Sequence, residues 1–140
     1  MTLPSIVEID RVALVENYRS LVAHVAPSTV CGVVKANGYG HGALIAARAA
    51  LAGGATILAV ALVDEAVELR TAGIDAPILL LSEPADADVP EAIAHELEMV
   101  VATPQKIDAI ASLTAGSARL HLEIDTGMHR AGCAPSDAPR

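Results

Sequence analysis

The sequence has very few aromatic residues and little positive charge. It contains 2 tyrosines, no phenylalanine and no tryptophan, and its 9 lysine and arginine residues are outnumbered by 17 acidic residues. Nucleic acids are bound by clustered basic side chains, and helices that lie on membranes also carry a basic face. Because the sequence has no such cluster, we expect neither nucleic acid nor a membrane as a partner.

Cysteine is equally scarce. Cys31 and Cys133 are the only two cysteines, and they lie far apart without CxxC spacing. Such a pair supports neither a disulfide framework nor a thiolate metal site. The beginning of the sequence also lacks the cationic start and long apolar run of a signal peptide. These features predict a reducing, cytoplasmic location.

Length and hydrophobic content limit the fold. With 140 residues, of which 53% are hydrophobic, the chain can bury one core. It is shorter than the roughly 250 residues of a complete (β/α)8 barrel. One nearly uncharged run, residues 43–63, has the length of a membrane span of about 20 residues. Gly53 and Gly54 interrupt this run, so we predict a helix followed by a strand.

Helical and strand patterns alternate along the chain. Asp10 is the predicted cap of a first helix, which ends before residue 27 and has an apolar face of Leu14, Tyr18, Leu21 and Val25. The further predicted helices span residues 41–52, 64–72, 89–95 and 104–113. The predicted strands span residues 29–36, 56–61, 77–81, 98–102 and 119–124.

The predicted strands are apolar nearly throughout, as in parallel sheets that are covered on both faces. Strands that alternate with helices are typical of α/β proteins. Periodicity alone fits both a doubly wound sheet and part of a (β/α)8 barrel, so the sequence pattern leaves both architectures open.

Lys35 is the first candidate for chemistry. The chain has only two lysines; Lys106 is expected on an exposed helix, as are His24 and His95, whereas Lys35 ends a predicted apolar strand. Active sites of α/β barrels lie at this end of the strands, and a cation is costly to bury there. Desolvation lowers the pKa of a lysine and makes its amine a nucleophile toward an aldehyde such as pyridoxal phosphate. The alternative is that Lys35 reaches solvent.

The residues after Lys35 favour a bound phosphate. Gly38, Gly40 and Gly42 alternate with polar residues, so the backbone can approach a ligand closely before the next helix begins. Tyr39 offers a hydroxyl to a phosphate. The same glycines also fit a simple tight turn, and their spacing is not that of a Walker loop.

Three segments resemble the alanine racemases. Residues 33–42 (VVKANGYGHG) resemble the cofactor-lysine signature of that family, residues 123–132 (EIDTGMHRAG) resemble its DTGM-x-R-x-G segment, and residues 5–10 resemble its opening. The family has a TIM-type barrel followed by a β-rich domain. The resemblance implies that residues 1–140 form the amino-terminal part of this pyridoxal-phosphate-binding barrel domain. We therefore expect an incomplete (β/α)8 barrel with about five of eight parallel strands, without the β domain.

The resemblance also implies roles for individual residues. Lys35 would hold pyridoxal phosphate as an aldimine and act as one of two catalytic bases. Tyr39 would bind the phosphate. Arg130 would donate to the phenolic oxygen of the cofactor and hold the substrate carboxylate, a role that suits its permanent charge. Asn37 and His41 would shape the loop.

Two supporting carboxylates follow in the second segment. Glu123 stands where many relatives have a lysine, often carbamylated, and would supply a permanent negative charge beside Arg130. Asp125 begins the DTGM motif. His129 replaces the usual small or amide residue of the family, a change that affects the packing beside Arg130.

The implied function is the interconversion of L- and D-alanine, which supplies D-alanine for the bacterial cell wall. Racemisation needs a base on each face of the substrate. In the family the second base is a tyrosine of the β-rich domain, from the partner subunit of a homodimer. Tyr18 is expected in the core and Tyr39 on the phosphate, so we predict that the chain alone is inactive, and that its open sheet edge makes it fold poorly.

Two alternatives have other chemistry. The chain could be a pyridoxal-phosphate-binding fragment or carrier without catalysis. Alternatively, His121, Glu123 and Asp125 alternate along the last strand and could hold the metal of a barrel hydrolase. No second histidine is suitably placed in the sequence, and a polar strand face is more typical of a hydrogen-bonded network, so we predict no metal.

Overall fold

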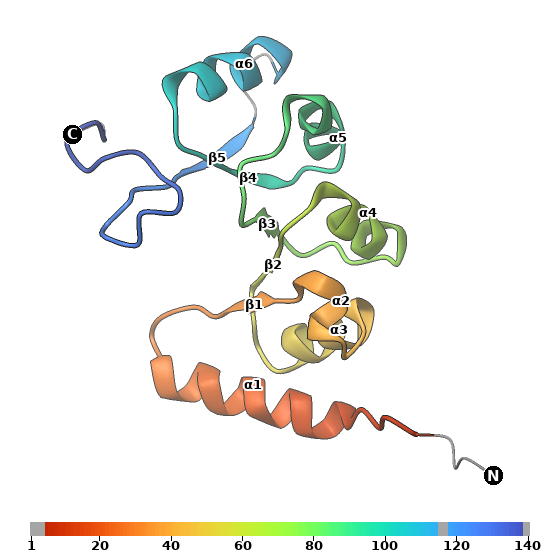
Figure 1. Ribbon diagram of the computed structural model, residues 1–140. Helices are drawn as coiled ribbons and strands as arrows, with labels where there is room; N and C mark the ends of the chain where they lie inside the picture. Colours follow the sequence, from red (N-terminus) through yellow and green to blue (C-terminus); the bar gives the residue numbers. More distant parts are fainter. Residues whose placement is uncertain (1–4, 115–117, 139–140) are drawn as a thin grey trace.

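The computed structural model describes residues 5–114 and 118–138, which form one curved parallel sheet with helices along one side (Figure 1). The strands of this described part are β1 (Cys31–Val33), β2 (Ile57–Val60), β3 (Ile78–Leu80), β4 (Glu98–Val101) and β5 (Arg119–Leu122). Each strand pairs in parallel with the next one in the sequence, so the sheet order is β1-β2-β3-β4-β5.

Strand order decides between the two architectures that the sequence pattern left open. A doubly wound sheet reverses its strand order at a switch point and carries helices on both faces. Here the order never reverses, and the helices form an outer arc around the strands (Figure 1). This is the arrangement of a TIM-type barrel, of which the described residues supply five of the eight strands. The predicted fold class is confirmed.

The helices follow the predicted pattern closely. They are α1 (Arg11–Val25), α2 (Lys35–Tyr39), α3 (Ala43–Ala52), α4 (Val63–Thr71), α5 (Val89–Ala94) and α6 (Pro104–Thr114), with a short 3-10 helix η1 (Asp86–Asp88). Each predicted helix and strand is present, with ends shifted by three residues at most. The sequence pattern did not predict α2 or η1, because both are shorter than two turns and have no apolar period.

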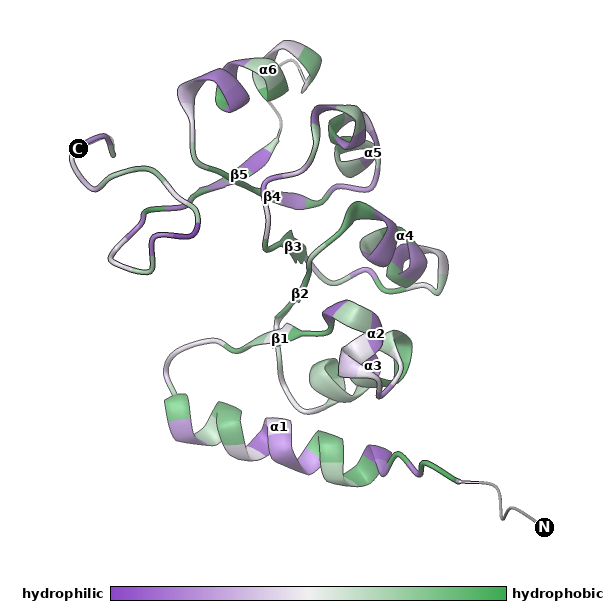
Figure 2. Ribbon diagram, viewed as in Figure 1, coloured by the Kyte–Doolittle hydropathy of each residue, from purple (hydrophilic) through white to green (hydrophobic). Residues whose placement is uncertain are grey.

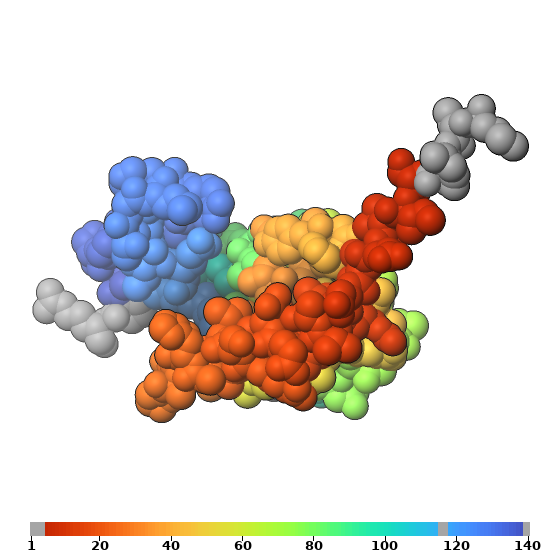
Figure 3. All heavy atoms as spheres, turned by 90° about the horizontal axis from the view of Figure 1, so that it is seen from below, coloured from red at the N-terminus to blue at the C-terminus, as the bar shows by residue number. Residues whose placement is uncertain are grey.

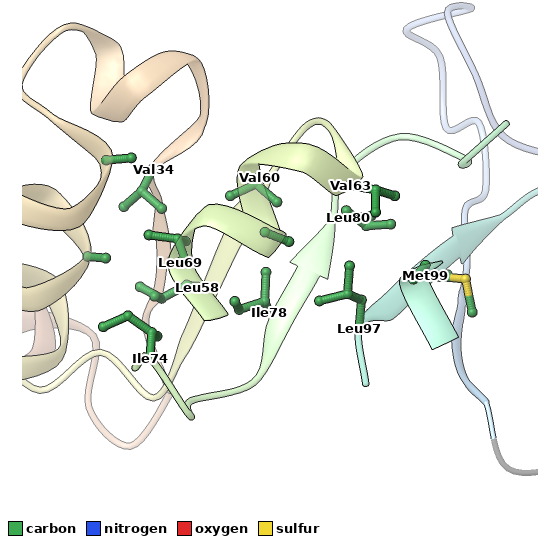
Figure 4. Close-up of a cluster of buried hydrophobic side chains, with 14 of the residues drawn as sticks. Val34, Leu58, Val60, Val63, Leu69, Ile74, Ile78, Leu80, Leu97 and Met99 are labelled. Carbon is green, nitrogen blue, oxygen red and sulfur yellow. The ribbon is translucent and has the colours of Figure 1, made fainter. Parts of the chain in front are cut away.

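The core lies between the sheet and the outer helices. Alternate residues of the central strands form its strand side and are fully buried; Figure 4 shows Leu58, Val60, Ile78, Leu80 and Met99 of this set. Val101 of β4 is also fully buried. Burying one such side chain contributes about 1.5–3 kcal/mol to stability. Leu69 of α4 and Ile110 of α6 complete the contact from the helix side.

The opposite, concave face of the sheet is only partly covered. Val33, Ile57 and Leu79 are half-buried there, and Leu81, just after β3, is exposed. The prediction that the apolar strands are covered on both faces therefore holds for β4, whose residues are all buried, and for Ala59 of β2, but not for β1 and β3. Apolar residues occur on the concave side because a closed barrel packs its own interior with them. The segment after β5 lies on this side of the sheet (Figure 1).

Helix α1 packs less deeply than its pattern predicted. Its N-cap is Asp10, whose Oδ1 accepts from the Val12 and Ala13 amides at 2.9 and 3.0 Å. Leu21 is exposed, contrary to the prediction that it belongs to the apolar face, and so is Val25. Leu14 and Tyr18 are half-buried as predicted, and the half-buried residues of α1 also include Val15 and Val22. Figure 3 shows α1 lying along the outside of the molecule, with residues 5–9 projecting from its end.

Tyr18 of α1 lies against the end of α3. A Cβ added at Gly53, at the end of α3, would collide with the Tyr18 Cβ and lie 2.8 Å from the Val15 carbonyl oxygen. Only glycine allows α1 and α3 to approach this closely. Burial raises the pKa of the Tyr18 hydroxyl, and the nearby thiol of Cys31 raises it further.

Lys106 corrects another prediction. Its side chain is 8% exposed, although α6 was expected to present it to solvent. The Nζ atom donates to Asp86 Oδ1 at 2.6 Å, and Asp86 itself is 90% exposed. The aliphatic stem is therefore buried, and the ammonium reaches the surface by pairing with Asp86 of η1. His95 is half-buried at the end of α5, whereas His24 is exposed as predicted.

The nearly uncharged run 43–63 forms α3 and β2, separated by Gly53 and Gly54. Within residues 5–114 and 118–138, no helix has the length and apolar character needed to cross a membrane.

Candidate active site

Lys35 follows directly on the first strand. The last ladder bond here is donated by the Val34 amide to the Ala59 carbonyl oxygen at 2.8 Å, and the half-buried Lys35 comes next. Lys35 therefore lies at the carboxyl end of β1, as predicted. This is the end of the sheet at which barrel enzymes carry their catalytic groups.

The backbone after Lys35 is left-handed. Ala36, Asn37, Gly38 and Tyr39 have φ values of 51, 54, 61 and 53°, so α2 contains a turn of the wrong hand for L-residues. Such a conformation costs roughly 1–2 kcal/mol for each residue other than glycine. The loop persists only if other contacts hold it, and strain of this kind is concentrated at functional sites.

Asn37 and His41 make two of the bonds that hold this loop. Asn37 Oδ1 accepts from the Ala43 amide at 2.8 Å, at the first residue of α3. The His41 ring donates from Nδ1 to the Gly38 carbonyl oxygen at 2.9 Å, since a carbonyl can only accept. Gly38 is buried, and a Cβ there would lie 3.0 Å from the Ala46 Cβ. These contacts attach the loop to the start of α3.

Glu65 makes a further bond to the loop that sequence reasoning missed. Its Oε1 accepts from the Ala36 amide at 2.6 Å, across 29 positions of sequence. Glu65 lies in the first turn of α4, where an acidic residue has an ordinary role next to the helix end. For that reason nothing in the sequence distinguished it.

A cavity of about 800 Å³ lies at the carboxyl ends of the strands. Its volume falls within the range of roughly 300–1,000 Å³ that is usual for small-molecule sites. The polar side chains that line it are Lys35, Ser82, Glu83, His121, Glu123 and Arg130. The sheet curvature thus brings Lys35, after β1, and Arg130, beyond β5, to one cavity from opposite edges of the sheet.

Not every predicted site residue reaches this cavity. Tyr39 is 60% exposed and is not part of the lining, and Asn37, His41 and Asp125 are also outside it. The structure therefore places Lys35, Glu123 and Arg130 in one cavity and leaves the other four outside its lining.

Asp125 organises the segment that carries Arg130. Its Oδ1 accepts from the Gly127 and His129 amides at 2.9 and 3.0 Å, and its Oδ2 pairs with His129 Nδ1 at 2.9 Å. The amide of His129, followed by that of Gly127, lowers the pKa of Asp125 below its usual range. His129 has a φ of 55° and is held by both its backbone and its ring. The side chain that departs from the family pattern therefore stabilises this loop.

The two ends of the same segment are joined. The Asp125 amide donates to the Cys133 carbonyl oxygen, and the Cys133 amide donates to the Glu123 carbonyl oxygen, both at 2.9 Å. We call residues 123–133 the arginine loop. The arginine loop is closed at its base and presents Arg130 on the concave side of the sheet.

The alternating polar residues of β5 do not form a metal site. His121 Nε2 lies 2.7 Å from Oε2 of the buried Glu98, and Arg119 pairs with the same carboxylate at 3.4 Å. Figure 2 shows the polar character of β5 and of the start of β4 against the apolar β2 and β3. In the described part of the chain, no three His, Cys, Asp or Glu side chains are grouped closely enough to hold a metal ion. The metal-hydrolase alternative has no support.

A model described as the amino-terminal domain of alanine racemase matches residues 9–140. The chain belongs to the alanine racemase family. It is 45% identical over 132 residues to the alanine racemase of Thermobifida fusca, an alignment that covers 92% of this chain and 35% of that protein. Alanine racemase 1 of Oceanobacillus iheyensis is 41% identical over 135 residues, covering 94% and 36%.

Solved structures of alanine racemases have the same fold. The crystal structure from E. faecalis is 47% identical, with a TM-score of 0.83, and the match covers 89% of this chain and 35% of that one. The Bacillus anthracis structure with bound L-Ala-P is 36% identical, with a TM-score of 0.82 and coverage of 89% and 33%. The chain spans about a third of the length of the alanine racemases that it matches.

Proposed function

We propose that the protein carrying this chain interconverts L- and D-alanine with pyridoxal phosphate held covalently by Lys35. The observation that carries the proposal is the shared cavity: a half-buried amine and a guanidinium converge there from the two edges of a barrel sheet. Membership of the alanine racemase family supports the same reaction. The product would serve cell-wall synthesis, and the cytoplasmic location stays a prediction.

The residues of the cavity fit the groups of this cofactor. Lys35 offers an amine to the aldehyde, Arg130 offers a fork of donors to an anionic oxygen, and Glu123 supplies a fixed negative charge in the same cavity. When bound, the cofactor supplies a conjugated ring that takes up the charge left on the substrate Cα. The Tyr39 side chain is exposed and lies outside the cavity lining. Its proposed role at the phosphate rests only on its position in the sequence, four residues after Lys35.

Each residue has a separate task in the proposed reaction. The Lys35 amine moves a proton at the substrate Cα on one face. The Arg130 guanidinium orients the substrate carboxylate, which fixes the face that is presented to Lys35. Glu123 balances the charge of Arg130, as a carbamylated lysine would in relatives.

The base for the opposite face lies outside these residues. Tyr18 is half-buried between α1 and α3, and Tyr39 is on the outside of the loop. We propose that a tyrosine of a second domain, from the partner subunit of a homodimer, supplies this base. The 140-residue chain alone is then expected to bind the cofactor without turning over alanine, which is the second candidate function.

The test compares the two lysines of the chain. Pyridoxal phosphate is added to the complete protein that carries this sequence, borohydride reduces the adduct, and the labelled peptide is mapped by mass spectrometry. We expect the label on Lys35, its loss in Lys35→Ala, and an unchanged yield in the control Lys106→Ala. D-alanine formation from L-alanine is measured in parallel.

Each result decides one part of the proposal. Label that persists on the same peptide in Lys35→Ala, or no label in the wild type, refutes the cofactor role of Lys35. Labelling of the complete protein without any D-alanine favours the carrier alternative. Turnover by residues 1–140 alone refutes the need for a base from outside.

A further inference from the structure

We propose that Glu65 is a positioning residue for Lys35, with one carboxylate that joins the carboxyl ends of β1 and β2 and fixes the peptide that follows the lysine. The inference rests on the proposed function, because it assumes that Lys35 holds the cofactor. It assigns to α4 a part in the site that the cavity lining does not reveal.

The two oxygens of Glu65 have different partners. Oε2 accepts from the Ala61 amide at 2.8 Å and from the Leu62 amide at 3.2 Å, which are the end of β2 and the cap of α4. These two bonds are local and would be made by an acidic residue at the start of any helix. Oε1 is left to accept from the Ala36 amide at 2.6 Å. A carboxylate has the capacity for all three bonds, whereas an amide side chain does not.

The Ala36 amide is the backbone donor next to Lys35. It belongs to the peptide between Lys35 and Ala36, so fixing its N–H fixes the ψ angle of Lys35 and with it the start of the side chain. The last bond from β1 to β2 comes two residues earlier, at Val34. Glu65 therefore continues the attachment to β2 beyond the point where the ladder ends.

The other bonds of the loop do not replace this one. Gly38 donates to the Val34 carbonyl oxygen at 2.9 Å, and Gly42 donates to the Asn37 carbonyl oxygen at 2.9 Å. These bonds hold the left-handed turn together internally, and Asn37 attaches it to α3. The Ala36–Glu65 bond alone among them joins the turn to the β2–α4 connection. Ala36 is also the first left-handed residue of the turn, with a φ of 51°, a conformation that persists only where other contacts hold it.

A similar bond occurs once more along the same end of the sheet. Glu83, after β3, accepts from the amide of Ala102, after β4, with Oε2 at 3.0 Å. In both cases a carboxylate from one strand end holds the backbone of a neighbouring strand end. The repetition indicates a general way of fixing the loops around the cavity, of which Glu65 serves the loop with the lysine.

Two substitutions separate geometry from charge. Glu65→Asp keeps the negative charge and can still cap α4, because aspartate is a good residue near a helix start. It is one methylene shorter and cannot also reach Ala36. Glu65→Gln removes the charge and places an amino group where one oxygen accepted. The control is Glu68→Gln, which removes a charge from an exposed position of the same helix.

The experiment measures the Ala36 amide and the Lys35 label in the complete protein that carries this sequence. Hydrogen exchange resolved to single amides reports the Ala36 bond, and limiting pyridoxal phosphate with borohydride reports the rate of labelling at Lys35. Loss of a hydrogen bond to a charged group changes an equilibrium constant by about tenfold or more. We expect Ala36 exchange to rise and Lys35 labelling to fall by that factor in both Glu65 variants. Glu68→Gln is expected to match the wild type.

The outcomes distinguish this inference from the proposed function. If Lys35 is not labelled in the wild type, the proposed function is wrong, and this inference is then wrong as well. If the wild type is labelled and Glu65→Asp is labelled at the same rate, the positioning role is wrong, whatever happens to Ala36 exchange. The role is also wrong if labelling falls while Ala36 exchange stays unchanged, or if Glu68→Gln has the same effect as Glu65→Asp.

Discussion

The two faces of the sheet are built from the same apolar strands and are covered to different extents. On the outer face, Leu58, Ile78 and Met99 are fully buried under helices. On the concave face, Leu79 is half-buried and Leu81 is exposed, and the polar groups of the cavity lie beside them. The difference teaches that the helices cover the outer face of the central strands, whereas the concave face leaves room for the polar side chains that line the cavity.

The largest expected effect compares neighbouring residues of β3. Leu80 points to the helices and is 1% exposed, whereas Leu79 points to the concave face and is half-buried. We expect Leu80→Ala to lower the free energy of unfolding by about 2–5 kcal/mol, and Leu79→Ala to lower it by about half as much or less. Urea unfolding of both variants measures the difference. Equal losses would show that the concave face is covered as well as the outer one.

A smaller effect tests how the helices of the outer face are joined. Arg70 of α4 donates to the carbonyl oxygens of Ile74 and Ala76, both at 2.7 Å, and of His95 at 3.1 Å. Removing it leaves these partly buried acceptors without a partner, so we expect Arg70→Ala to cost about 1–3 kcal/mol in urea unfolding. Arg48→Ala is the matched control, because Arg48 makes a single long bond of 3.4 Å to Ala72. A similar loss for both arginines would contradict the assignment.

The smallest effect is local and lies on the concave side. Hydrogen bonds hold the folded-state pKa of Asp125 below its value of 3.8 in unstructured chains. The stabilisation is therefore present above that unfolded value and is lost as the pH falls through the folded-state pKa. We expect the arginine loop to loosen at acid pH while β2 and β3 stay folded, as followed by NMR shifts of His129. Asp125→Asn should remove this acid transition, and a transition that persists in the variant would assign it to another group.

Much of the fold followed from local pattern. The α3, α4 and β2 segments were predicted because apolar runs are interrupted by glycine pairs or single glycines, and such signals depend on neighbours in sequence. The order of the strands did not follow, because periodicity does not contain information on which strand lies beside which. The burial of Lys106 was also missed, since it depends on η1 and on Asp86, which is 20 residues away.

The site was predicted in part for the same reason. Lys35 and Arg130 were found from short motifs, and the structure brings them to one cavity. Glu65 and Glu98 were missed, because each acts on residues that are distant in sequence and adjacent only across neighbouring strands. The glycines after Lys35 predicted a close approach to a ligand or a tight turn, but not that Ala36, Asn37 and Tyr39 would adopt a left-handed backbone.

The curvature of the sheet determines whether Lys35 and Arg130 can line the same cavity. Lys35 and Arg130 belong to the outermost strand ends, with three strands between them, and only the curvature brings them within reach of one small molecule. A ligand bound by both residues would join the two edges of the sheet, and its affinity would be thermodynamically linked to the curvature of the sheet. Substitutions that reduce the curvature of the sheet, even far from the cavity, would then weaken ligand binding although Lys35 and Arg130 are both still present.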